Sequence, residues 1–452
     1  MAFRKSTYGR WGNYGRWGTS RDRGARSGTD YQPSPPPPLG ELIKTLPLND
    51  TGSVVSDGEE DCGISNTRLV ASYSWMNGPG AKIVVPGKPP LWTPPKGPQK
   101  LREDSGVFYR DRNAASYPSH PMEPAVISIM RMHPEPLSVD FVACASTLGN
   151  LLRHVRGAGQ SFRMLVEVVG QTVHLIRREN SPNESIPNVR GYGHRFLEAY
   201  TSWEPGLGRS LSHQRIVKFC LGGLDVLVRY EVDGYVGSEQ PRASAGEDTA
   251  DALGQMGGLR LHQDDVVTES KDGGLEVGNA GSSTPQNPIL GIKTRSINAR
   301  HKDNLGEQMP RLWARQSPKL VLTYHTQGVF EDVHVQDIST AIKDWEADNQ
   351  AAIRQLVALL RNLARDALAD EDGKLELLGR EGGELELRRR LPDAGTAFSR
   401  SVRAQWEDWL DEGRKKEAVD DDGFSDGWSD DGGAKDLTAC DRDCGYCGKC
   451  QY

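Results

Sequence analysis

Three long stretches of this 452-residue chain are too polar or too biased in composition to contribute a hydrophobic core. Glycine and proline account for 50 and 27 residues, and hydrophobic residues make up only 36% of the chain. What remains suits one good-sized domain rather than the two or three that the length suggests. The expected organisation is a disordered head, basic and then proline-rich (1–66), a single core domain (67–237 and 286–366) with a disordered insert (238–285), a largely disordered acidic tail (367–436) and a cysteine-rich end (437–452).

No apolar run approaches the roughly 20 residues that a bilayer crossing requires. The run at 356–360, one of the longest, is about a quarter of that length. The residues that follow Met1 are polar and lack the apolar segment of a signal peptide. We therefore expect an intracellular protein, nuclear or cytoplasmic, with no membrane partner.

The head combines positive charge with aromatic residues. The sequence Tyr-Gly-Arg-Trp-Gly occurs at 8–12 and again at 14–18, and a run of four prolines follows at 35–38. Guanidinium groups pair with phosphates, and Tyr and Trp rings stack on unpaired bases, so this composition suits sequence-tolerant RNA binding. A solvated, flexible terminus has the same composition, and the sequence does not separate the two interpretations.

Between the biased stretches, short periodic segments alternate with turns. Their order indicates a mixed α/β (α+β) domain with a central mixed β-sheet flanked by helices. Helices are expected over 146–155, over 193–200 and from 337 or 339 to about 363. Strands are expected at 139–143, 162–169, 172–177, 214–219, 224–232, 289–294 and 319–325.

Two carboxylates lie two residues apart at the end of one expected strand, in Glu231-Val232-Asp233. Residues at this spacing project from the same face of a strand, where like charges repel. A divalent cation relieves the repulsion, and oxygen ligands of this kind suit Mg²⁺ or Mn²⁺, which can activate water against a phosphodiester. The alternative is an exposed strand end with solvated acids.

Two further residues could act with this pair. Lys293 ends the apolar strand that follows the insert, where an ammonium group could orient the attacking water or neutralise a developing negative charge. Glu198, on the helix expected over 193–200, could reach the same metal through water. Histidines such as His194 have no partner at a metal-binding spacing and are better explained as surface or satisfied core residues.

The order and spacing of these elements resemble the DXO-type decapping exoribonucleases, whose nuclease fold is related to the PD-(D/E)XK enzymes. Over about 139–363, the Glu-apolar-Asp motif of that family is matched by 231–233. Its Gly-apolar-x-aromatic-Glu motif resembles 193–198, with one extra residue before the acid, and its Trp and Gln resemble 313–316. Its Glu-apolar-Lys motif resembles 291–293, but Gly291 stands where the family has a glutamate.

The resemblance implies an RNA substrate with an incomplete or unusual 5′ end and phosphodiester hydrolysis by metal-activated water. It implies Glu231 and Asp233 as ligands of Mg²⁺ or Mn²⁺, Glu198 as a ligand or water holder, Lys293 as a charge stabiliser and Gln316 as an orienting group. Because Gly291 has no side chain, one expected carboxylate ligand is missing.

Four of the seven cysteines lie in the last 13 residues, as Cys440, Cys444, Cys447 and Cys450. Four thiolates at this spacing suit one tetrahedral Zn²⁺, with glycines that permit tight turns. An iron–sulfur cluster and a metal-free tail are the alternatives. A zinc knuckle of this size suits RNA or protein binding better than catalysis.

Two hypotheses follow for the function. The first is a divergent, metal-dependent nuclease that processes RNA 5′ ends by decapping, pyrophosphohydrolase or exonuclease chemistry. The alternative is a non-catalytic relative of that fold that binds RNA or protein and has lost the metal ligand at Gly291. RNA is the expected partner in the first case, with a protein partner such as an exoribonuclease as a further expectation.

Overall fold

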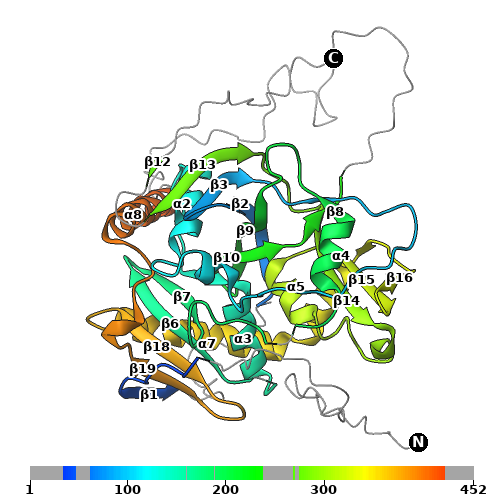
Figure 1. Ribbon diagram of the computed structural model, residues 1–452. Coiled ribbons are helices and arrows are strands. Elements are labelled where there is room, and N and C mark those ends of the chain that lie inside the picture. The colour runs from blue at the N-terminus through cyan, green and yellow to red at the C-terminus, as the bar shows by residue number, and fades with distance from the viewer. Residues whose placement is uncertain are drawn as a thin grey trace, which may run out of the picture.

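The computed structural model describes residues 34–46, 62–158, 160–187, 189–237, 268–269 and 274–422. Two β-sheets form the centre of this part of the chain, and helices cover them (Figure 1). The mixed α/β class with a large mixed sheet is therefore confirmed. No described helix combines the length and the apolar character that a membrane crossing needs.

The first sheet has twelve strands. Most neighbours are antiparallel, but β5 pairs in parallel with both β7 and β10, and β13 pairs in parallel with β3. In spatial order the strands are β1 (Leu42–Leu46), β19 (Leu385–Arg389), β18 (Lys374–Gly379), β6 (Phe162–Val169), β7 (Thr172–Arg178), β5 (Phe141–Cys144), β10 (Leu224–Val232), β9 (Ser210–Leu221), β2 (Ile64–Met76), β3 (Ala81–Gly87), β13 (Leu275–Gly281) and β12 (Thr268–Glu269).

The second sheet has seven strands and packs beside α4 (Gly193–Tyr200) (Figure 1). Phe196 and Tyr200 of α4 bury their rings against Leu290, Val321 and Phe330 of this sheet. The strands are β16 (Val329–Phe330), β15 (Lys319–Thr326), β14 (Ile289–Ser296), β11 (Gly234–Tyr235), β4 (Leu91–Trp92) and β8 (Thr201–Ser202), with β17 (Gln336–Asp337) paired to β15.

Helices bury both faces of the first sheet, which makes two separate hydrophobic cores. One face carries α3 (Ala145–Val155), α5 (Met309–Arg315), α6 (Ser339–Asp348) and α7 (Gln350–Leu368). The other carries α2 (Glu123–Met132) and α8 (Arg400–Asp422). The remaining short helices are α1 (Arg112–Ser116), η1 (Ile297–Ala299) and η2 (Pro392–Ala394).

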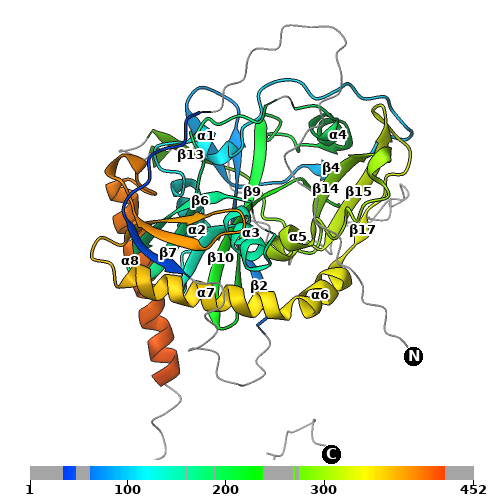
Figure 2. The same cartoon turned by 90° about the horizontal axis from the view of Figure 1, so that it is seen from below.

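The long helix expected from 337 or 339 to about 363 is in fact two helices, α6 and α7, which run one after the other along one side of the molecule (Figure 2). They meet at Asn349, whose backbone leaves the helical region at φ −113° and ψ 17°. The Asn349 side chain instead donates to the carbonyl of Trp345 at 2.7 Å. A polar side chain that bonds its own preceding turn competes with the helix, which explains the break.

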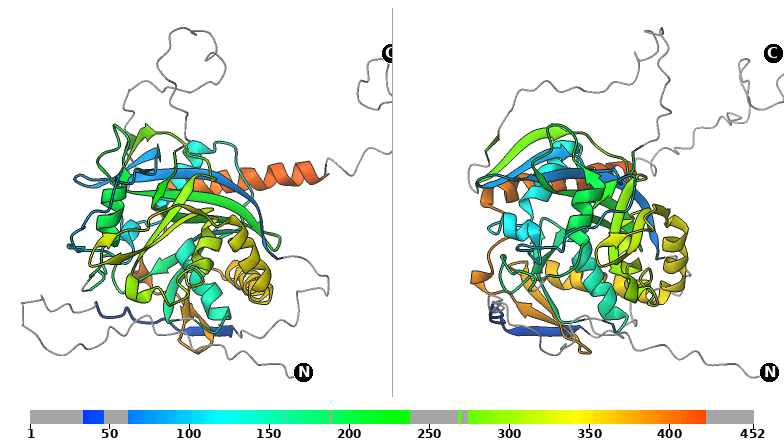
Figure 3. Two further views of the ribbon diagram at one scale, coloured as in Figure 1. Left: turned by 90° about the vertical axis from the view of Figure 1, so that its right-hand side faces the viewer. Right: turned by 45° about the vertical axis from the view of Figure 1, so that its right-hand side comes forward.

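The fold extends beyond the core that the sequence predicts. Strand β1 lies within the segment 1–66, β13 lies within 238–285, and β18, β19 and α8 lie within 367–436, so ordered elements extend into all three segments for which the sequence predicts disorder. Helix α8 packs along the first sheet and projects past it (Figure 3). Its apolar residues recur at helical spacing inside a charged sequence, as Val402, Trp406, Trp409 and Leu410.

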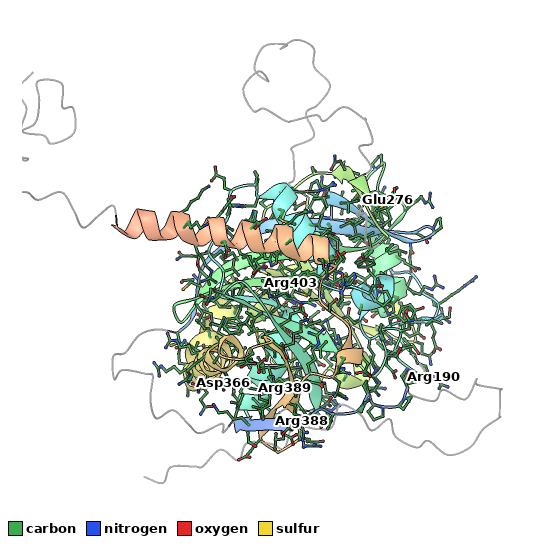
Figure 4. The ribbon with its side chains drawn as sticks, turned by 90° about the vertical axis from the view of Figure 1, so that its left-hand side faces the viewer. Arg190, Glu276, Asp366, Arg388, Arg389 and Arg403 are labelled. Carbon is green, nitrogen blue, oxygen red and sulfur yellow. The ribbon has the colours of Figure 1, made fainter. Side chains whose placement is uncertain are left out.

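The proline-rich segment that precedes β1 is held against the domain. The Arg163 guanidinium donates to the carbonyl of Pro37 at 2.5 Å and to that of Pro38 at 3.0 Å. Asn180 donates to the carbonyl of Ser34 at 2.9 Å. At the same end of the molecule, Lys44 of β1 pairs with Asp366 at 2.9 Å, and Figure 4 shows Asp366 near Arg388 and Arg389 of β19.

A buried charge cluster attaches α8 to the sheet. Glu167 of β6 is 1% exposed and pairs with Arg390 at 2.7 Å and with Arg403 of α8 at 2.8 Å. Burial raises the pKa of Glu167, but Arg390 and Arg403 outweigh it and hold the pKa below its usual range. Nearby, the Trp406 indole donates to Nε2 of His174 at 2.9 Å, and burial lowers the pKa of His174 to about 4. The imidazole is therefore a neutral acceptor for α8.

Replacing Glu167 with Gln should destabilise the fold strongly, because it leaves the buried Arg390 without its counter-charge. The expected loss is about 3–5 kcal/mol in the free energy of unfolding, measured by urea denaturation. The control is Lys82→Ala, which breaks an ion pair with Glu276 at the surface, where the expected loss is below about 1 kcal/mol. Equal effects of the two substitutions would contradict the role given to Glu167.

Candidate functional site

The fold brings together two of the motif segments that the sequence singles out. β11 pairs antiparallel with β14, with Gly234 opposite Leu290 and Tyr235 opposite Ile289. Asp233, just before β11, accepts a hydrogen bond at Oδ2 from the backbone N–H of Ile292 at 2.8 Å. The end of β10, with Asp233 directly after it, therefore lies beside the segment 291–293 of β14.

Glu231 and Glu198 both lie close enough to His194 to act on its charge. Both carboxylates act to raise the pKa of this imidazole, but burial outweighs them and keeps the pKa below its ordinary value. Each acid also has a cation beside it. Glu231 lies 3.7 Å from Arg112, and the exposed Glu198 pairs with Arg195 at 2.7 Å.

Helix α4 is held at its N-terminus by a residue far away in the chain. The carboxylate of Asp104 accepts from the backbone N–H of His194 at 3.2 Å and from that of Arg195 at 2.9 Å. This capping satisfies N–H groups that have no partner within the helix. The His194 ring stacks on Phe108, with centroids 3.8 Å apart, and the loop around 104–108 thus positions α4 beside Glu231.

Lys293 lies in a crowded and mostly positive environment. Burial, and then the neighbouring Arg295 and Arg311, lower its pKa to about 8, against the opposing effect of Asp233 and Glu307. Arg315 of α5 is also buried beside another cation. Burial and Arg311 lower its pKa to about 10, while Asp233 and Glu231 act in the opposite direction.

Position 291 lies two residues before Lys293 on β14, and so on the same face of the strand, but its immediate neighbours are apolar. A Cβ added to Gly291 would lie 3.6 Å from Leu312 Cδ2 and 3.7 Å from Leu320 Cδ1, both ordinary apolar contacts. The place where the resemblance leads us to expect a glutamate therefore belongs to the hydrophobic core between β14 and α5.

Gln316 has a structural task in this fold. It ends α5 in the left-handed conformation, at φ 50°, and its side-chain amide donates to the carbonyl of Trp313 at 2.8 Å. Its own carbonyl accepts from Gln286 at 2.8 Å. The orienting role that the resemblance implies for Gln316 stays a prediction.

The acids do not assemble into a metal centre. In the part of the chain that the structure describes, no three His, Cys, Asp or Glu side chains converge closely enough to hold a metal ion. With Gly291 in an apolar environment and a cation beside both Glu198 and Glu231, the residues present do not fit the Mg²⁺ or Mn²⁺ site that the resemblance implies. The expected Zn²⁺ ligands Cys440, Cys444, Cys447 and Cys450 lie outside the described residues.

Sequence reasoning missed the cations of the site: Arg112, Arg311 and Arg315. Arg311 and Arg315 are four residues apart on α5. A helix predicted there would have placed both side chains on one face. Arg112 follows a loop-rich segment and gives no periodic signal.

Comparison with solved structures identifies the class of fold. The chain is similar to Rai1 of Scheffersomyces stipitis in complex with (3′-NADP)⁺ and calcium ion, with 11% identity, a TM-score of 0.52 and coverage of 83% of this chain and 99% of that one. It is also similar to Rai1 of Candida albicans in complex with pU5-Mn²⁺, with 10% identity, a TM-score of 0.50 and coverage of 81% and 99%. The predicted resemblance to the DXO-type decapping exonucleases is therefore confirmed for the fold.

The sequence itself places the chain in a narrower family. Residues 45–378 match the model of a family described as Domain of unknown function (DUF8563), and the chain belongs to that family. A search of curated protein sequences finds no match.

The low pKa of Lys293 predicts a change of stability with pH. Between about pH 8 and the ordinary lysine pKa of 10.5, the folded protein has released this proton and the unfolded chain has kept it. Linkage then makes the free energy of unfolding rise with pH in this window. Lys293→Met should lose that rise, measured by urea denaturation at pH 7.5 and pH 10, while Lys343→Met at an exposed position of α6 should keep the wild-type difference. An unchanged pH response in Lys293→Met would contradict the assignment.

A carboxylate at position 291 should be poorly tolerated. Gly291→Glu places a charge against Leu312 and Leu320 and should cost more than about 2 kcal/mol of unfolding free energy. Gly291→Ala adds only a methyl group at ordinary contact distance and should stay within about 1 kcal/mol of wild type. If Gly291→Glu is as stable as wild type and Mn²⁺ raises its melting temperature, the added carboxylate reaches the charged residues instead of lying against Leu312 and Leu320.

Proposed function

We propose that this chain binds RNA through the positively charged surface around β10, β14 and α5 and does not cleave it. The observation that carries the proposal is the charge balance at the candidate site, which we define as Glu231, Asp233, Lys293, Arg311 and Arg315. Three cations face two acids there, and burial, followed by the neighbouring cations, lowers the pKa values of Lys293 and Arg315.

A polyanion is the ligand that this arrangement suits. Phosphate groups relieve the repulsion between Lys293, Arg311 and Arg315, and guanidinium groups bind phosphate oxygens in pairs of hydrogen bonds. The structure of Candida albicans Rai1 with pU5-Mn²⁺ holds a short RNA on a similar fold. The repeated Tyr-Gly-Arg-Trp-Gly head of this chain adds guanidinium and aromatic groups of the kind that bind single strands.

A metal-dependent nuclease that processes RNA 5′ ends is the second candidate. It is favoured by the juxtaposition of Asp233 with β14, which keeps the Glu231/Asp233 pair near Lys293 as the DXO-type resemblance requires. In that case Glu231 and Asp233 would be the metal ligands, with Glu198 beside them, and Lys293 would stabilise the developing charge.

One experiment separates the candidates. The purified full-length chain is mixed with 5′-labelled RNAs that carry a monophosphate, a triphosphate or an unmethylated cap, with Mg²⁺, Mn²⁺ or a chelator. We expect retention of the RNA on a filter without loss of label, because the acids do not form a three-ligand metal group. Arg311→Gln should weaken binding severalfold and lower the salt dependence by about one unit, while Arg354→Gln, exposed on α7, should not.

Metal-dependent loss of RNA that disappears in Glu231→Ala/Asp233→Ala would overturn the binding-only proposal and establish the nuclease. Neither loss nor retention of RNA would exclude both candidates and leave a protein-interaction role, such as binding an exoribonuclease. The double alanine variant should bind RNA at least as well as wild type under the binding-only proposal, because it removes two negative charges from the site.

A further inference from the structure

A cavity of about 500 Å³ opens beside the candidate site and is lined by an unusual concentration of arginines. Its single acidic lining residue is Glu179, which pairs with Arg177. We call it the arginine pocket and define it by its six guanidinium groups, those of Arg110, Arg153, Arg163, Arg177, Arg178 and Arg311.

The pocket lies where the topology favours ligand binding. β5 runs parallel to β7 and β10, with Ala143 opposite Leu175 and Cys144 opposite Arg229, so the carboxyl ends of the three strands meet at one edge of the sheet. Ligands of α/β sheets bind outside such edges. The segment after β5 and the end of β7 both contribute to the pocket wall.

Helix α3 adds a further positive end. It starts directly after β5, and its first residues Ala145 and Ser146 line the pocket, as do Gly149 and Asn150 one turn later. Its first turn contains no acidic side chain. The partial positive charge of a helix N-terminus attracts anions, and here it adds to the field of the six arginines.

Nearby carboxylates neutralise only part of the positive charge of the six arginines. Arg163 and Arg178 share the buried carboxylate of Glu376, at 2.6 Å and 2.9 Å. With Glu179, and with Asp111 and Asp393 acting on Arg177 and Arg178, four carboxylates face the six guanidinium groups. Like charges gathered in a cavity repel, and a ligand with several negative charges removes the repulsion.

We propose that the arginine pocket binds an oligophosphate group, that is, several linked phosphates in one compact ligand. A volume of about 500 Å³ suits a small molecule and is within the range of ordinary ligand pockets. Arg163 already donates to Pro37, Pro38 and Glu376, so the other five guanidinium groups supply most of the donors for the phosphate oxygens. Free polyphosphate, a nucleoside triphosphate and an RNA with a terminal triphosphate share this chemistry. The inference goes beyond the proposed function and stands without it, because it needs neither a strand of RNA nor turnover.

The test measures binding of inorganic tripolyphosphate to the full-length chain by calorimetry at constant ionic strength. We expect one molecule bound per chain, with an affinity that falls as salt rises. Arg110→Gln/Arg153→Gln should weaken binding about tenfold or more, since each lost charge-assisted contact contributes on that scale. Both residues are exposed, so the fold should not suffer.

The matched control is Arg354→Gln/Arg365→Gln on α7, outside the pocket. Arg365 contacts Asn362 three residues earlier, as Arg153 contacts Asn150, so the pairs of substitutions remove equal charge from similar surroundings. An equal loss of affinity in both double variants would overturn the proposal, as would the absence of tripolyphosphate binding in wild type.

Competition distinguishes the sources of the phosphates. Tripolyphosphate should displace a five-nucleotide RNA with a 5′-triphosphate more readily than the same RNA with a 5′-hydroxyl. If both RNAs bind equally and tripolyphosphate displaces neither, the arginines serve the sugar–phosphate backbone, and the proposal fails while RNA binding stands. If tripolyphosphate binds and no RNA is retained, the proposal holds and the proposed function fails.

Discussion

The pairing of β10 with its two neighbours determines where the charged groups of the molecule lie. β10 is antiparallel to β9 and parallel to β5, so its hydrogen bonds are satisfied on both edges and its register cannot shift without reversing every side chain. This register places Arg229 beside Cys144 and Glu231 beside Gln214, at the edge where α3 begins. The acid pair, the cations of α5 and the arginine pocket all lie around that edge.

The loss of one acid and the surplus of arginine can be understood together. A carboxylate at position 291 would have balanced part of the charge of Lys293 and Arg315, but this position is now packed against Leu312 and Leu320. The remaining acids are too few to neutralise the cations around them. A site built for hydrolysis with metal ions has a surplus of carboxylates, whereas this one has a surplus of guanidinium groups, which supports the RNA binding that we propose.

The sequence predicts the centre of the fold well and its periphery poorly. The expected elements at 162–169, 193–200 and 224–232 coincide with β6, α4 and β10, because each carries a clear period and ends at a glycine or a polar turn. Helix α8 was missed because its core residues, such as Trp406 and Leu410, stand in a strongly charged sequence that composition alone classifies as disordered. Strand β1 was missed because it is only five residues long and follows a proline run.

The candidate site shows the same division. Glu231, Asp233 and Lys293 belong to local motifs, and pairing of β11 with β14 brings those motifs together as the DXO-type resemblance implies. The arginine pocket had no such signal. Its members come from a loop, from α3, β6, β7 and α5, and only the sheet order brings them to one cavity. No local pattern could reveal it, because the information lies in the long-range pairing.

The attachment of α8 also bears on how the protein is made. Trp406, Trp409 and Leu410 of α8 cover part of one face of the first sheet, and every strand of that sheet precedes α8 in the chain. During synthesis from the N-terminus, α2 can cover its part of that face early, but the part under α8 stays open until α8 leaves the ribosome, and Glu167 has no counter-charge until Arg390 and Arg403 follow. The nascent chain therefore passes through a late stage in which most of the sheet exists and the part of the second core that α8 buries is open to water.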